Sequence, residues 1–168
     1  MEKQIEFLPN LNHIISDPFH DLMHGIVGVV MYPLLIIVQI ITDILNNELC
    51  DFILDESKQL GYYEKICTVF KPSMIVVPQR YDLTNFQKKV KLSVSGTQSL
   101  YILHSFYIVV CKIIEEKKDI LDSISKMLQI KSLIECLLNL CYMTMDHEIS
   151  VHEAIKITTT NVDHFYKV

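Results

Sequence analysis

The sequence of 168 residues has little glycine or proline, no tryptophan and one arginine, with 4 Gly, 5 Pro and Arg80 alone. So few turn-forming residues argue against collagen-like repeats, flexible linkers and turn-rich sandwiches or barrels. A single arginine leaves almost no guanidinium forks for phosphate or guanine. Apolar residues make up 50% of the chain and charged residues 21%. This balance excludes intrinsic disorder and indicates one folded domain, residues 1–168.

The chain also lacks any CxxC pair. Its five cysteines are odd in number and lie mostly inside apolar runs: Cys50, Cys67, Cys111, Cys136 and Cys141. Free cysteines in such runs behave as small hydrophobic residues, which is typical of a reducing compartment. The first residues are acidic and lack the basic start of a signal peptide. We therefore expect an intracellular protein, nuclear or cytoplasmic.

The net charge of −5 is unevenly distributed. Residues 1–64 hold 2 basic and 10 acidic side chains, residues 65–131 hold 11 and 5, and residues 132–168 hold 2 and 5. Only the middle segment could face a polyanion, and the acidic ends oppose strong nucleic-acid binding. The candidates for weak nucleic-acid contacts are Lys71, Arg80, Lys88, Lys89 and Lys91. A solvated lysine-rich segment is the alternative.

No charged residue occurs between Asp21 and Asp43. A stretch of this length could cross a bilayer. Acidic rather than basic flanks oppose that interpretation, and His24, Gln39 and Thr42 interrupt the stretch. We favour a buried core helix over a membrane span at residues 22–42.

Two stripes of apolar residues at spacings of three and four predict a long antiparallel helical hairpin. The first stripe is Leu100, Leu103, Tyr107, Val110 and Ile114. The second is Ile120, Ile124, Met127, Ile130, Ile134, Leu137 and Cys141. A charged turn at residues 115–119 joins the two helices.

The other segments also favour helices. We expect a helix over residues 19–46, broken or kinked at Pro33 because proline removes a backbone donor. A second helix is expected over residues 49–63, ending near Gly61, followed by a loop at 71–84 with a short extended piece at 74–77. A last helix begins near Ser150, capped by Ser150 and Glu153. The predicted fold is an all-α, irregular bundle of about five to six helices.

Polar residues with metal-binding potential occur near both ends. Asp17, His20, Asp21 and His24 share one face of a helix, a spacing that suits a divalent metal. We prefer the alternative to a metal site, which is a solvent-exposed helix start, because acidic residues are favoured at that end of a helix without any metal. A second group at Asp146, His147, Glu148, His152 and Glu153 fits an exposed junction better than a site. His104, inside an apolar stripe, is expected to be a core histidine with a satisfied nitrogen.

The segment Asp17-Pro18-Phe19-His20-Asp21-Leu22-Met23-His24-Gly25 resembles a D-x-x-H-D-L-x-E-G motif. That motif belongs to animal transposon-derived proteins related to the CACTA-type cut-and-paste DNA transposases. Further on, Lys89-Val90-Lys91 followed by Ser95-Gly96-Thr97-Gln98 is similar to their basic strip and S-A-S-Q sequence. The resemblance covers roughly residues 15–145.

The resemblance implies the helical C-terminal region of a transposase whose catalytic acids lie on an RNase-H-like core. In such enzymes three carboxylates hold two divalent metals. The family's glutamate aligns here with His24, and an imidazole is a poor replacement for a bridging carboxylate. Only 16 residues precede Asp17, too few for the strands of that core. The resemblance therefore predicts an inactive fragment, without a cofactor and without a complete acidic triad.

These observations leave three hypotheses open. The first is a non-catalytic, transposase-derived helical protein that retains weak protein or nucleic-acid binding. The second is a small helical module that binds a protein partner through an exposed apolar surface. The third is a membrane-anchored protein. The sequence does not determine the oligomeric state.

Overall fold

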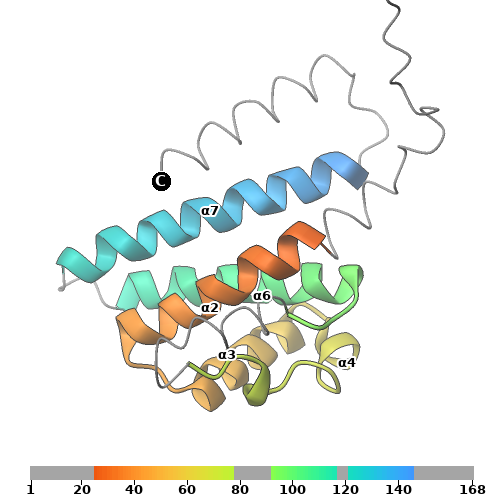
Figure 1. The fold of residues 1–168 in the computed structure, drawn as a ribbon, viewed down its shortest axis with the longest axis horizontal. Coiled ribbons are helices and arrows are strands. Elements are labelled where there is room, and N and C mark those ends of the chain that lie inside the picture. Colours follow the sequence, from red (N-terminus) through yellow and green to blue (C-terminus); the bar gives the residue numbers. More distant parts are fainter. Residues whose placement is uncertain (1–24, 78–91, 117–120, 146–168) are drawn as a thin grey trace, which may run out of the picture.

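The computed structural model describes residues 25–77, 92–116 and 121–145, and these ranges consist of helices and the turns that join them (Figure 1). The α-helices are α2 (Gly28–Thr42), α3 (Asn46–Gln59), α4 (Tyr63–Ile66), α6 (Gly96–Glu116) and α7 (Leu121–Met145). A 3-10 turn, η2, covers Pro72–Met74. The described ranges contain no strand. The all-α prediction is confirmed, while the helix predicted from Ser150 lies outside the described residues.

Helices α6 and α7 form the predicted antiparallel pair and pack along most of their length (Figure 1). On α7 the buried positions include most of the predicted stripe: Met127, Ile130, Ile134, Leu137 and Cys141. On α6 the buried face is Ile102, Leu103, Phe106, Val109, Val110 and Ile113. The predicted α6 stripe is therefore only partly right, because Leu100, Tyr107 and Ile114 are half-buried. The buried face is displaced because α6 also packs against α3.

Helix α6 begins with a reciprocal capping box. The Gln98 backbone N–H donates to Ser95 Oγ at 3.3 Å, and the Ser95 backbone N–H donates to Gln98 Oε1 at 3.0 Å. Two backbone donors at the helix start are thereby satisfied. The Gln98 amide also donates to the Lys65 carbonyl at 3.3 Å, which ties the start of α6 to α4. Ser95 and Gln98, which the resemblance singled out, have this local structural role.

Helix α2 continues through Pro33, so the predicted break at this residue is wrong. Proline removes one helical hydrogen bond, but the burial of Met31, Leu34 and Leu35 on both sides of it offsets the loss. Near this point the Gly28 carbonyl accepts a hydrogen bond from the Leu92 N–H at 3.1 Å. Helix α2 contacts both α6 and α7, so it places its buried face against the hairpin.

Helix α3 begins earlier than predicted and ends, as predicted, near Gly61. Glu48 starts it by accepting a hydrogen bond from the Leu45 N–H at 3.0 Å. The helix is terminated by Gly61, whose backbone is in the left-handed region with φ of 75°. Around this glycine the Tyr62 N–H donates to the Ser57 carbonyl at 2.7 Å and the Gly61 N–H to the Lys58 carbonyl at 3.2 Å. These two bonds make a Schellman motif, which turns the chain into α4.

The loop after α4 contains a short helical turn that overlaps the predicted extended piece at its first residue. Met74 belongs to η2, and no strand occurs within residues 71–77. The following residue, Ile75, is fully buried and its carbonyl accepts a hydrogen bond from Gln39 Nε2 at 2.8 Å. The same amide nitrogen lies 3.1 Å from the Leu35 carbonyl. The buried Gln39 thus holds this loop against α2.

Replacement of Gly61 by alanine should destabilise the fold by about 1–2 kcal/mol, since a Cβ is strained in the left-handed region. No neighbour would obstruct the new methyl group, so conformational strain is the only cause. Urea unfolding followed by circular dichroism measures the effect. Gly25→Ala is the matched control, because its Cβ also meets nothing and its φ is not left-handed. Equal effects of the two substitutions would contradict the Schellman assignment.

Candidate functional site

Most residues of the predicted sites lie outside the described ranges. This holds for the candidate metal residues Asp17, His20, Asp21 and His24, for the group at 146–153, and for Arg80, Lys88, Lys89 and Lys91. Within the described ranges no group of three or more His, Cys, Asp or Glu residues could hold a metal ion.

Lys71 is the one predicted nucleic-acid contact that the structure describes. Its side chain is exposed, and its Nζ donates to the Cys67 carbonyl at 2.7 Å. A lysine near the end of a helix is favoured there by the partial negative charge of the last carbonyls. Lys71 therefore has a local structural role at the end of α4.

Four aromatic rings gather where the α3–α4 turn meets α6 and α7. We call Tyr62, Tyr101, His104 and Tyr142 the aromatic cluster. The Tyr62 ring stacks on Tyr101 at a centroid distance of 4.5 Å and on His104 at 6.0 Å. The rings of His104 and Tyr142 lie 5.6 Å apart, and the Tyr142 hydroxyl hydrogen-bonds His104 Nε2. The cluster thus joins segments that are distant in sequence.

His104 has the satisfied nitrogen that its sequence context predicted, but it lies at the half-buried edge of the core. Burial lowers its pKa from the ordinary value of 6.5, because the imidazolium loses hydration there. The pKa of Tyr142 is raised, first by burial and then by Tyr62 and Cys141. Both shifts favour the neutral forms in the folded chain.

A second polar contact joins α6 to α7. The Tyr107 hydroxyl donates to Glu135 Oε1 at 2.7 Å, and Lys131 Nζ lies 2.8 Å from the same oxygen. The ammonium of Lys131 also lies 5.8 Å from the Tyr107 ring centre. The hydrogen bond to Glu135 is the largest cause that raises the pKa of Tyr107 to about 12. Tyr107 is therefore a neutral hydrogen-bond donor here.

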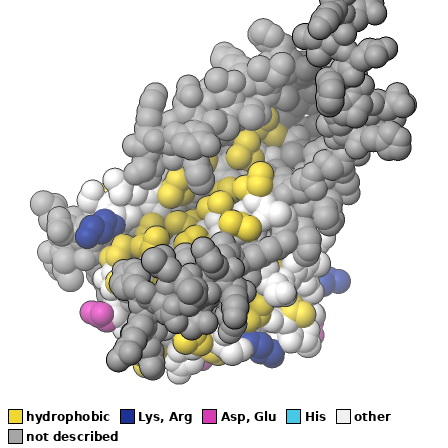
Figure 2. Space-filling view, in the orientation of Figure 1, with side chains coloured by type: hydrophobic (Ala, Val, Ile, Leu, Met, Phe, Trp, Pro, Cys, Tyr) yellow, Lys and Arg dark blue, Asp and Glu magenta, His cyan; other side chains and the backbone are white. Residues whose placement is uncertain are grey.

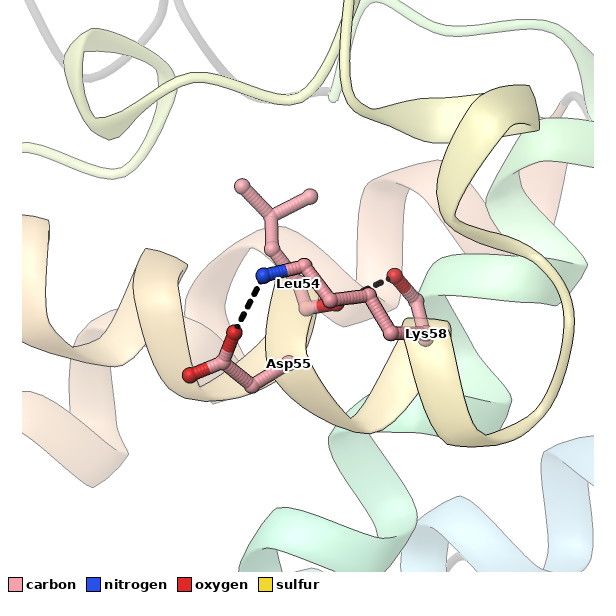
Figure 3. A network of polar contacts seen from close by, with 4 residues as sticks. Leu54, Asp55 and Lys58 are labelled. Carbon is pink, nitrogen blue, oxygen red and sulfur yellow. Dashed lines mark hydrogen bonds and ion pairs between the residues drawn. The ribbon is translucent and has the colours of Figure 1, made fainter.

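The ion pair between Glu56 on α3 and Lys112 on α6 joins two helices that are far apart in sequence. The Glu56 side chain is 10% exposed, so its carboxylate depends on this contact for much of its solvation. The pair between Asp55 and Lys58 is different, since both side chains are more than half exposed and lie within α3 (Figure 3). An exposed pair of this kind contributes little to stability.

The outer face of α2 and the turn before it is an exposed apolar row. It consists of Ile26 (52% exposed), Val29 (40%), Pro33 (half-buried), Ile37 (41%) and Ile40 (57%). We call this row the α2 stripe. The spacings of three, four, four and three place these residues within about 80° on a helix. Figure 2 shows hydrophobic side chains in a diagonal band along the course of α2.

Sequence reasoning missed the α2 stripe because every side of α2 is apolar. The buried positions Val27, Met31 and Leu35 cannot be distinguished by residue type from the exposed Val29 and Ile37. The length of the charge-free stretch could have indicated an exposed apolar face. A helix on the edge of a small bundle must expose one face, and this helix has no charged residue to place there.

Comparison with known proteins finds no family model, curated protein or solved structure that matches the chain. The transposase resemblance therefore stays a prediction, and the function has to be inferred from the geometry of the chain itself.

The low pKa of His104 predicts that the fold loses stability in mild acid. The unfolded histidine binds a proton below its ordinary pKa of 6.5, while the folded one resists protonation to a lower pH. The contribution of His104 is thus complete above pH 6.5 and declines as the pH falls below that value. Urea unfolding at about pH 8 and about pH 5 measures the difference.

His104→Phe should reduce this acid sensitivity, because phenylalanine keeps a ring and does not titrate. Tyr142→Phe should keep it, because burial rather than the hydroxyl causes the shift. The same acid sensitivity in His104→Phe and the unmodified chain would show that His104 is not responsible.

Lys112→Ala should destabilise the fold by about 1–2 kcal/mol, because it leaves the Glu56 carboxylate largely buried without its cation. Lys58→Ala is the matched control and should produce no measurable change, since the pair shown in Figure 3 is exposed. Chemical denaturation of both variants at one pH provides the comparison. A smaller loss for Lys112→Ala than for Lys58→Ala would contradict the structural role of this pair.

Proposed function

We propose that this chain is a non-catalytic, transposase-derived helical module that binds another protein through the α2 stripe. The observation that carries the proposal is a row of exposed β-branched side chains around the half-buried Pro33, on a helix without any charged residue. Exposed contiguous apolar surface of this kind marks contact sites on folded proteins.

The size and shape of the α2 stripe suit a helical partner. Its two ends, Ile26 and Ile40, are 14 residues apart in sequence, which corresponds to roughly 21 Å along a helix axis. Anchors at spacings of three and four are the pattern with which helices dock against one another or into grooves. Burial of this apolar surface favours a complex, and the gain must exceed the cost of the translational and side-chain freedom that is lost on binding.

A bilayer is the competing contact for the same surface. By length and composition, Gly25–Thr42 and Gly96–Glu116 could each cross a membrane, with mean hydropathies of 2.3 and 1.3. However, α3 packs against α6 and exposes Asp51, Asp55 and Lys58. If α6 spanned a membrane, these charges would lie at the depth of the hydrocarbon core, which costs several kcal/mol. The packing of α3 therefore argues against a membrane span at α6.

The non-catalytic part of the proposal rests on the resemblance, in which His24 stands where the related motif has glutamate. Nucleic-acid binding through the basic middle segment remains a weaker candidate. Of the five predicted contacts the described ranges include Lys71, whose ammonium donates to a backbone carbonyl.

A photoreactive benzophenone side chain placed at Ile37 should give a discrete protein adduct in cells that express the chain. The same group at Phe52 is the matched control, because Phe52 is similarly exposed (48%) on α3, away from the stripe. Denaturing gels of the irradiated cells measure the adduct. Adducts with lipid alone, or equal protein labelling from both positions, would contradict the proposal. Strand cleavage that depends on Mn²⁺ and is lost in Asp21→Ala would contradict its non-catalytic part.

A further inference from the structure

We draw no further inference here: the strongest candidate, the exposed apolar face of α2 between Ile26 and Ile40, carries none because nothing in the part of the chain that the structure describes shows what covers it.

Discussion

Helix α2 has no polar face, and this constrains how it can pack on the other described helices. One side of it, which includes Val27, Met31, Leu35 and Val38, is buried completely against the bundle. Its two buried polar groups bond to backbone carbonyls, Gln39 to those of Leu35 and Ile75 and Thr42 to that of Val38 at 2.6 Å. Both buried polar side chains of α2 are thus hydrogen-bonded, while the opposite side of the helix is apolar and exposed.

The polar contacts between helices lie at the edges of this apolar core, and most of them involve α6. Lys112 joins it to α3, Tyr107 joins it to α7, and Tyr101 and His104 join it to the turn before α4 and to α7. Each contact constrains the rotation of α6 relative to a neighbour, which apolar packing alone constrains less strictly. Helix α6 is therefore the element around which the described helices are oriented, and α2 completes the arrangement by packing on the hairpin.

The sequence predicted best where local periodicity determines the outcome. The spacing of Met127, Ile130, Ile134 and Leu137 identified the buried face of α7. The spacing of apolar residues identified the buried face of α6 less well. Helix α6 contacts both α7 and α3, which displaces its buried face from the predicted stripe. The break at Pro33 was wrong because tertiary burial outweighed the loss of one hydrogen bond. The exposed face of α2 could not be identified at all, because residues of the same type occupy its buried and exposed sides.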